Sequence, residues 1–578
     1  MYVLGLNIGS HDTSAALLDC TTGRLLYASE QERFNRIKHT KSLPIDCARE
    51  LLKCAEISSS QIDAVSLGWN FESMYKNLYL DELFGGNLAH AKRDYRKFIQ
   101  LDASLTTFMS ELGLTCRQYK YSHHLSHHAH SYYSSGFKDA TSICIDGYGD
   151  RCTASIAKCM NKNIRIVHEV RFPGSLGLFY SAITHYLGFK SHCDEGITMG
   201  LAPFGDANCK IHINGNESTY KEYFRSLIAF NEGQIKFDDT KLLIGHNKAG
   251  WVSATLQQDI GPRRGPGDPM TEAHKNIAAA AQNRLQEILL EMVGFAVDKT
   301  GIQENICLSG GVALNCVAND IIRRQYKQSR VYVPQSPGDS GVAIGSALLA
   351  SIRKVPHISF DLKSLNRTSY GPEYDYSLTV DYFQRSRIEG LIYEHCLEEE
   401  FINKVVGYLQ QGKIVGWFSG GSEFGPRALG HRSILSRPSP SSVRDFVNAR
   451  VKFREAFRPF APAILEEYCS EYFDLNIVSK HMLFAANYRS SSPHDISATV
   501  HVDGTARVQV VNKDNGLFYK LLDRFQRLTG IPVLLNTSFN VKGQPIVETP
   551  LEAFQTFETT NIDVLAFPGH IYSKQSGI

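Results

Sequence analysis

Short apolar runs separated by polar loops dominate the first 30 residues. Apolar positions cover residues 3–6, 15–18 and 25–28, while polar residues 7–12 and a turn at residues 19–23 divide them. Runs of this length bounded by Gly, Asn and Asp are typical of strands. The pattern predicts three strands and, between the first two, a glycine-containing loop of the kind that presents backbone N–H groups to phosphate.

Strand and helix patterns alternate farther along. Residues 276–297 carry apolar side chains at helical spacing, and residues 305–308 and 331–333 are short apolar runs typical of buried strands. Small residues from 339 to 349 predict a closely packed helix. This alternation indicates the α/β fold class.

The pattern weakens between residues 354 and 376, where prolines and polar residues interrupt it. New strand candidates follow at residues 414–418 and 533–535, each ending in a polar turn. The sequence therefore predicts two domains. They are a first domain over residues 1–355, a linker over residues 356–380 and a second domain over residues 381–578.

Composition excludes several classes of protein. The 578 residues include 61 Lys and Arg against 59 Asp and Glu, so there is no basic excess for nucleic acid. Thirteen scattered cysteines without a Cys-x-x-Cys pair disfavour a disulfide framework and favour a reducing compartment. No apolar run reaches the roughly 18 residues of a membrane helix, and the start does not resemble a signal peptide. We therefore expect a cytoplasmic protein that binds neither membrane nor nucleic acid.

Five histidines fall within residues 123–130 of a predicted helix. His123 and His127 share one face at a spacing of i, i+4, and so do His124 and His128. Two imidazoles at that spacing can bind one divalent metal ion. Spacing does not choose between the pairs, and a polar, exposed helix with solvated histidines is the alternative.

Further polar residues follow predicted strands, where α/β folds build their sites. Asp146 comes after an apolar strand, and Asp339 lies at a strand-to-helix turn. Gly310 and Gly311 let a ligand approach the backbone, although paired glycines are also ordinary turn residues. His11, in the first loop, is a candidate general base, with a histidine that bonds its own turn as the simpler interpretation.

Cations and aromatic residues are mixed between residues 427 and 458. Four cations fall from Arg450 to Arg458 among phenylalanines and prolines, and Arg427 precedes them in a glycine-rich segment. Arg suits bidentate recognition of phosphate or carboxylate, and Lys adds a point charge. A solvated basic face fits these aromatic neighbours poorly. With a net charge near zero, a concentrated site for a small anion is favoured.

Taken together, the motifs resemble those of the O-carbamoyltransferases of the nodulation-factor, cephamycin and aminoglycoside-antibiotic type. The matching segments run in order from residue 3 to about residue 551. They include VLGLNIGSHDTSAALL, HHLSHHAHSYY, LSGGVALN, PGDSGVAIGSAL, GWFSGGSEFGPRALGHRSIL, NARVKFREAFRPFAPAIL, HVDGTARVQ and LLNTSFNVKGQPIVETP.

The resemblance implies a fold and a reaction. The first domain is expected to be actin-like, of the Kae1 type with two related α/β halves, and the second a YrdC-like twisted sheet. Carbamoyl phosphate and ATP, the latter with Mg, would form carbamoyl adenylate in the second domain. The carbamoyl group would then pass to a hydroxyl of a small-molecule natural product in the first domain.

The resemblance also implies roles for single residues. It selects His123 and His127 over the other histidine pair as ligands of a divalent metal, iron above all, together with Asp146 and Asp339. It implies that His11 takes the proton of the acceptor hydroxyl. The adenylate contacts would be Gly310, Gly311 and Asn315, and the contacts to carbamoyl phosphate and ATP phosphates would be Arg427, Lys452, Arg454, Arg458, His501, Arg507, Asn536 and Ser538.

Three positions depart from the family pattern. Ile197 stands where relatives usually have Lys, and His128 and His130 stand where relatives usually have small residues. The acceptor is therefore not predicted, and its specificity is expected to reside in loops such as residues 69–100. A homodimer is allowed. Two other functions compete: a tRNA-modifying enzyme of the threonylcarbamoyl-adenosine type, which the charge balance disfavours, and a non-catalytic or sugar-kinase-like ATP-binding protein, which would not need the second-domain cations.

Overall fold

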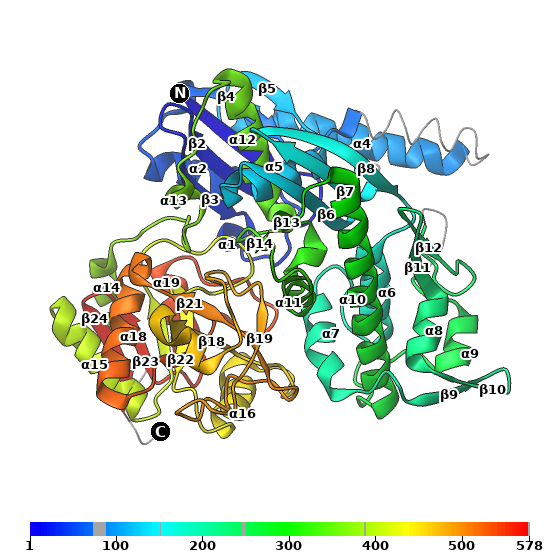
Figure 1. The fold of residues 1–578 in the computed structure, drawn as a ribbon. Coiled ribbons are helices and arrows are strands. Elements are labelled where there is room, and N and C mark those ends of the chain that lie inside the picture. Colours follow the sequence, from blue (N-terminus) through cyan, green and yellow to red (C-terminus); the bar gives the residue numbers. More distant parts are fainter. Residues whose placement is uncertain (73–87, 151, 246–249, 386–388, 576–578) are drawn as a thin grey trace. The chain divides into compact units, whose positions relative to one another are not determined.

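A computed structural model describes residues 1–72, 88–150, 152–245, 250–385 and 389–575 of the chain. The chain folds into two compact units (Figure 1). The first unit consists of Met1–Leu26, Lys41–Ile45 and Ile57–Asn366, and the second of Tyr27–Thr40, Asp46–Glu56 and Arg367–Ile578.

The chain passes from the first to the second unit after Asn366, inside the segment predicted as a linker. Two early segments, Tyr27–Thr40 and Asp46–Glu56, belong to the second unit, although the sequence-based division assigned them to the first domain. Arg33 illustrates the reason, because its buried guanidinium donates to the carbonyl oxygen of Gly425 at 2.7 Å. A contact between residues so far apart leaves no mark on local periodicity.

Two five-stranded sheets in the first unit share one pattern. Their strand orders are β3-β2-β1-β4-β5 and β8-β7-β6-β13-β14. In each sheet the central strand, β1 or β6, pairs antiparallel with the next strand in sequence and parallel with a later one. The strands are β1 (Tyr2–Asn7), β2 (Ser14–Asp19), β3 (Arg24–Glu30), β4 (Ile62–Leu67), β5 (Arg117–Lys120), β6 (Asp139–Gly149), β7 (Cys152–Met160), β8 (Asn163–Arg171), β13 (Asn305–Ser309) and β14 (Arg330–Tyr332).

Helices α5 (His123–Ser135) and α12 (Val342–Lys354) lie side by side against these sheets (Figure 1). A Cβ atom on Gly345 of α12 would lie 1.8 Å from the carbonyl oxygen of Ser126, so only glycine allows this approach. The small residues of α12 therefore allow the close helix packing that they predicted. The other elements of this unit are α4 (Leu88–Glu111), α6 (Leu176–Tyr186), α7 (Glu195–Leu201), α8 (Tyr220–Leu227), α9 (Ala254–Ile260), α10 (Glu272–Thr300), α11 (Cys316–Gln325), α13 (Leu362–Leu365) and the hairpins β9–β10 (Lys210–Ile213, Asn216–Thr219) and β11–β12 (Ile228–Asn231, Gln234–Phe237).

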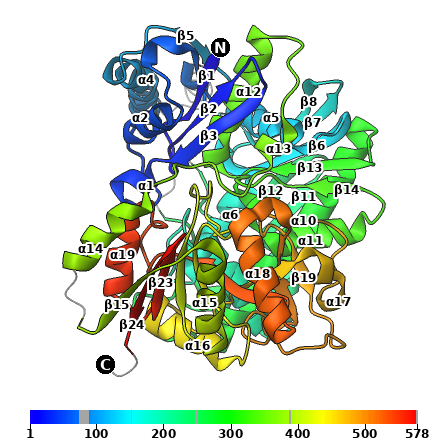
Figure 2. The ribbon, with the colours of Figure 1, turned by 90° about the vertical axis from the view of Figure 1, so that its left-hand side faces the viewer.

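An eight-stranded sheet of order β15-β24-β23-β16-β17-β22-β18-β21 forms the second unit. Helices α15 (Glu398–Gln410) and α18 (Gly516–Thr529) lie together on one face (Figure 2), and α19 (Pro550–Glu558) packs into the core on the other. The strands are β15 (Leu391–His395), β16 (Val415–Phe418), β17 (Arg432–Ser436), β18 (Ala461–Leu465), β21 (Gln509–Val511), β22 (Val533–Ser538), β23 (Val564–Phe567) and β24 (His570–Lys574). A separate pair is β19 (Ala485–Asn487) with β20 (Thr505–Arg507), and the remaining helices are α1 (Glu32–Asn35), α2 (Ile45–Cys54), α14 (Thr379–Arg385), α16 (Ser442–Val447) and α17 (Cys469–Tyr472).

The predicted α/β class is confirmed, while the finer assignment to actin-like and YrdC-like folds stays a prediction. Among the residues that the structure describes, no helix combines the length and the apolar character needed to cross a membrane.

Candidate functional site

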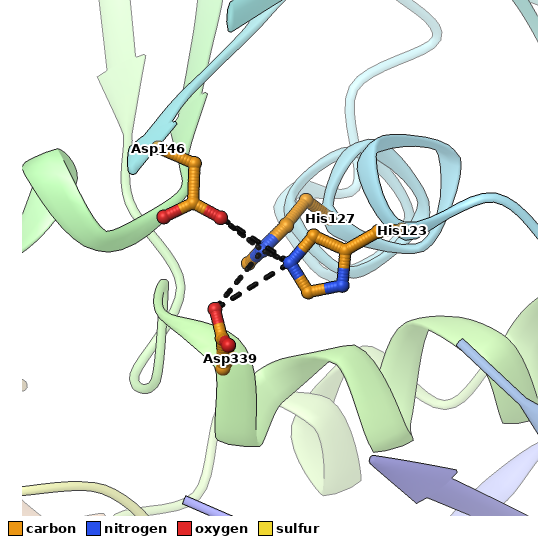
Figure 3. Close-up of side chains that lie close together, drawn as sticks. All are labelled: His123, His127, Asp146 and Asp339. Carbon is orange, nitrogen blue, oxygen red and sulfur yellow. Dashed lines mark hydrogen bonds and ion pairs between the residues drawn. The ribbon is translucent and has the colours of Figure 1, made fainter. Parts of the chain in front are cut away.

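Two histidines and two aspartates meet in the first unit, and we call them the ligand group (Figure 3). His123 Nε2 lies 3.1 Å from His127 Nε2, 3.2 Å from Asp146 Oδ2 and 3.4 Å from Asp339 Oδ1. His127 Nε2 lies 3.5 Å and 3.9 Å from the same two carboxylate oxygens. All four residues are buried. Two nitrogen and two oxygen atoms therefore converge on one point.

Helix α5, the end of β6 and the turn before α12 supply these side chains. The N-terminus of α5 is fixed twice, because Ser122 Oγ accepts from Leu125 N and the buried Asp150 carboxylate accepts from His123 N. The i, i+4 spacing on this helix turns both imidazoles to one side. Asp146 closes the regular pairing of β6, and Asp339 begins the turn that leads into α12.

Each carboxylate uses one oxygen for support and turns the other to the histidines. Asp146 Oδ1 accepts from the backbone N–H groups of Gly147 at 2.8 Å and Gly311 at 3.1 Å. Asp339 Oδ2 accepts from the hydroxyl of Ser10. The orientation of the ligand group is therefore built into the surrounding loops.

Mutual attraction decides the protonation of the ligand group. Burial alone lowers the pKa of His123, but Asp339 and Asp146 outweigh it and raise the pKa to about 10. Burial raises the pKa of Asp146, but His123 and His127 outweigh it and hold that pKa well below its ordinary value. The pKa of Asp339 is lowered by His123 in the same way, against burial and the Asp146 charge. The carboxylates are thus ready to hold a cation.

The second histidine pair faces another environment. His124 Nδ1 lies 2.8 Å from Ser155 Oγ, and His128 lies 2.8 Å from the same hydroxyl and 2.7 Å from Ser142 Oγ. Burial is the main cause of lowered pKa values in both, to about 3 for His128. The exposed polar helix considered as the alternative is wrong, because all five histidines of α5 are buried. His130 is likewise buried, beside Gly341.

His11 lies in the loop between β1 and β2. Its Nδ1 is 2.7 Å from Asp12 Oδ2, and its ring lies 6.3 Å from that of His192. Burial lowers the pKa of His11, but the Asp12 hydrogen bond and the Asp339 charge outweigh it and raise the pKa to about 9. His11 thus lies within the electrostatic reach of the ligand group.

The predicted adenylate-contacting residues follow β13. Gly310 has φ +86°, and Gly311 donates its backbone N–H to Asp146, so this turn supports the ligand group directly. The Asn315 side chain caps α11 and exchanges hydrogen bonds of 3.2 and 2.9 Å with Gln282. A nucleotide role for the three stays a prediction. Ile197 lies buried in α7.

In the second unit, Lys452 is a buried lysine. It ends a π-helical turn, Asn448–Lys452, a feature that often marks functional sites. Its Nζ donates to the carbonyl oxygens of Ser538 and Asn540, each at 2.7 Å, and to Ser538 Oγ at 3.2 Å. Burial and repulsion from Arg454 and Arg458 hold the pKa of Lys452 well below its ordinary value.

Arginines surround Lys452, and we call Lys452, Arg454, Arg458 and Arg507 the cation cluster. Burial and repulsion from Arg458 and Arg507 hold the pKa of Arg454 well below its ordinary value. Asn448 Oδ1 accepts from Arg454 Nε at 2.7 Å, and the guanidinium lies 4.6 Å from the centre of the Phe460 ring. Positive charge concentrated in this way favours an anion.

Of the remaining predicted residues of this unit, one contacts the cation cluster and the others bond the surrounding strands and turns. Ser538 contacts Lys452. Asn536, on the same strand, is buried and donates to Ala428 O at 3.2 Å and Gln509 Oε1 at 2.8 Å. Asn536 thus joins the strand to the loop that carries Arg427. His501 forms a turn through its backbone bonds with Thr505 and Gly504. Their contacts with a ligand stay predictions.

Sequence reasoning missed several supporting residues. Ser10 and Trp69 contact the ligand group, and Asn448 and Asn540 bond the cation cluster. Trp69 lies two residues beyond the end of β4, so its place after a strand was the available signal. The loop from 69 to 100, expected to set acceptor specificity, lies partly outside the described residues.

Comparison with known proteins gives a consistent assignment. Residues 2–348 match the family described as the carbamoyltransferase N-terminus, and residues 406–574 match the carbamoyltransferase C-terminus. An uncharacterized protein of Synechocystis, sll1178, is 33% identical, with 99% of this chain and 97% of that protein covered. Nodulation protein NolNO of Sinorhizobium fredii is 32% identical, with 99% of this chain and 80% of that protein covered.

Solved structures are more distant. Full-length HypF in its phosphate- and nucleotide-bound form matches with a TM-score of 0.34 and 13% identity, over 62% of this chain and 47% of that one. A likeness at that level carries no argument about this chain. Both family models and the relatives over its full length show that the chain belongs to the carbamoyltransferase family and is a transferase.

Proposed function

We propose that the protein is an ATP-dependent O-carbamoyltransferase that works in two steps. Carbamoyl phosphate first gives carbamate and phosphate with one water molecule, and the carbamate oxygen attacks the α-phosphorus of ATP. The products are carbamoyl adenylate and pyrophosphate. An acceptor hydroxyl then attacks the carbamoyl carbon, its proton leaves, and AMP departs.

The cation cluster supports the first step. Phosphoryl transfer develops negative charge on the leaving pyrophosphate, and fixed cations stabilise it. Lys452 and Arg454 are held in place by Ser538, Asn540 and Asn448 before any ligand arrives. An anion would relieve their repulsion, so the cost of placing these charges together is offset by substrate binding. We assign Arg458, Arg507, Arg427 and His501 to the same phosphates, and Mg²⁺ to the ATP.

The ligand group fits a divalent first-row metal. Two Nε2 atoms face each other at 3.1 Å, with carboxylate oxygens at 3.2 to 3.9 Å, so a bound cation would replace a shared proton. Imidazole and carboxylate donors suit Fe²⁺, Mn²⁺ and Zn²⁺, and we propose iron. When bound, the metal supplies Lewis-acid polarisation of an oxygen.

Residues of the first unit support the second step. We propose that the His11 imidazole accepts the proton of the acceptor hydroxyl, with Asp12 orienting the ring through its Nδ1 bond of 2.7 Å. We assign Gly310, Gly311 and Asn315 to the adenylate, since glycines let a ligand approach the backbone closely. The acceptor is proposed to be a hydroxylated small molecule from secondary metabolism, and the working place of the enzyme the cytoplasm.

Two observations carry this proposal: the buried ligand group of one unit and, in the other, the cation cluster around the buried Lys452. ATP–pyrophosphate exchange tests it, with carbamoyl phosphate and Mg²⁺ supplied and no acceptor. We expect exchange that requires carbamoyl phosphate and is accompanied by phosphate release. Exchange that depends instead on threonine and bicarbonate would favour the tRNA-modifying alternative, and no exchange would contradict the proposal.

A further inference from the structure

Two buried side chains connect the loop of His11 to the ligand group. Asn7, at the end of β1, donates through Nδ2 to the carbonyl oxygens of His11 at 3.3 Å and Asp12 at 3.0 Å. Its Oδ1 accepts a 2.8 Å hydrogen bond from Trp69 Nε1. The Trp69 ring lies against His123, with ring centroids 3.8 Å apart. A continuous path of contacts therefore runs from the loop of His11 to His123 of the ligand group.

Burial shields this path from solvent. Asn7 is 0% and Trp69 4% exposed, so water does not compete for their hydrogen bonds. Trp69 also stacks on Phe71 at 5.7 Å, and a Cβ atom on Gly9 would lie 2.4 Å from the Phe71 ring. The first loop thus packs on the same aromatic pair from which Asn7 receives its hydrogen bond.

The two halves of the first unit differ at this point. Asp146 at the end of β6 turns a carboxylate directly to the histidines, whereas Asn7 at the end of β1 offers an amide. Only an amide donates to two carbonyl oxygens and accepts from an indole at once. The chemistry of Asn7 is therefore that of a connector and not of a metal ligand.

We propose that Asn7 and Trp69 are positioning residues for carbamoyl transfer, which fix His11 relative to His123. This inference rests on the proposed function, because it assigns a geometry to the proposed base. Displacing a reacting group by about 1 Å costs about a hundredfold in rate. The two residues act on the base without touching the substrate.

Trp69→Phe tests the inference, because it keeps a ring against His123 and removes the N–H that Asn7 accepts. AMP release from carbamoyl adenylate is measured with D-glucosamine as the probe acceptor. We expect kcat to fall about tenfold to a hundredfold, with KM for the probe nearly unchanged. Co²⁺ binding, followed by absorbance, should keep its stoichiometry. The matched control Trp417→Phe removes an indole donor to Gly430 in the second unit and should change neither readout.

Combining the variant with His11→Ala decides between positioning and general damage. If Trp69 acts through His11, Trp69→Phe adds less than about a twofold loss to His11→Ala. A full additional loss, or loss of Co²⁺ binding, overturns the inference. If His11→Ala alone leaves AMP release unchanged, the proposed function of His11 fails instead. Asn7→Asp keeps the acceptor for Trp69 but not the two donors, and it should repeat the result if Trp69→Phe does not fold.

Discussion

The two units bury charge of opposite kinds. In the first, two carboxylates hold two imidazoles between them, and attraction lowers the pKa of Asp146 while raising that of His123. In the second, Lys452 and Arg454 repel their neighbours, and both pKa values fall. Attraction prepares a site for a cation, and repulsion prepares a site for an anion. The contrast is the basis for our proposal that one unit binds phosphates while the other holds a metal ion.

The largest expected effect is the loss of carbamoyl transfer when a residue of the ligand group is replaced. His127→Ala removes one of the four donor side chains. The rate of transfer should therefore fall by more than the roughly hundredfold that is typical when a residue that only supports a ligand is lost. Transfer to D-glucosamine from carbamoyl adenylate measures it. His128→Ala is the matched control, because that histidine lies on the same helix but bonds Ser142 and Ser155. Equal losses in both variants would contradict a specific role for His127.

Replacing Lys452 should abolish most of the adenylate formation that we propose for the cation cluster. Lys452→Met removes the buried amine that we propose to contact phosphate, and ATP–pyrophosphate exchange should fall about a hundredfold or more. Transfer from supplied carbamoyl adenylate should stay close to the unaltered protein. Arg450→Ala is the control, since this nearby cation is exposed and should leave exchange unchanged. Normal exchange in Lys452→Met would exclude this residue from the site.

The pH dependence of carbamoyl transfer tests His11 as the base in the first unit. The Asp12 carboxylate stabilises the protonated form of His11, whose pKa is raised to about 9, and a base works only when deprotonated. Transfer should therefore rise with pH. Asp12→Asn removes the stabilising charge, lowers the pKa of His11, and should move the rise to lower pH. An unshifted profile at the same metal loading would argue against His11 as the base.

The smallest expected effect is the uptake of a proton when carbamoyl phosphate binds to the cation cluster. A bound phosphate stabilises the ammonium form of Lys452, so its lowered pKa should rise and a proton should enter from solution. Calorimetry of carbamoyl phosphate binding in buffers of different ionisation enthalpy measures this uptake, which should disappear in Lys452→Met. Release of protons, or uptake that persists in the variant, would contradict this reading of Lys452.

Local pattern predicted much of the fold. The first three strands, the long helix α10 and the strand before Gly310 follow from periodicity, because each is stabilised by its own buried face. The residues of the ligand group were also predictable, since His123 and His127 have i, i+4 spacing on a helix and both aspartates lie after predicted strands. Spacing alone left both histidine pairs open, and the resemblance to a family chose between them.

Residues that act through long-range contacts were not predictable in this way. Trp69 is one aromatic residue among many until β4 brings its indole to Asn7 and its ring to His123. The segment Tyr27–Thr40 joins the second unit through contacts such as Arg33 with Gly425, nearly 400 residues apart in sequence. Neither contact has a signature in the local order of polar and apolar residues.

The most direct test of the central claim is ATP–pyrophosphate exchange by His127→Ala in the absence of acceptor. If adenylate formation belongs to the cation cluster and transfer to the ligand group, exchange should stay within about twofold of the unaltered protein. A loss of exchange as large as the loss of transfer would contradict the division of the reaction between the two units.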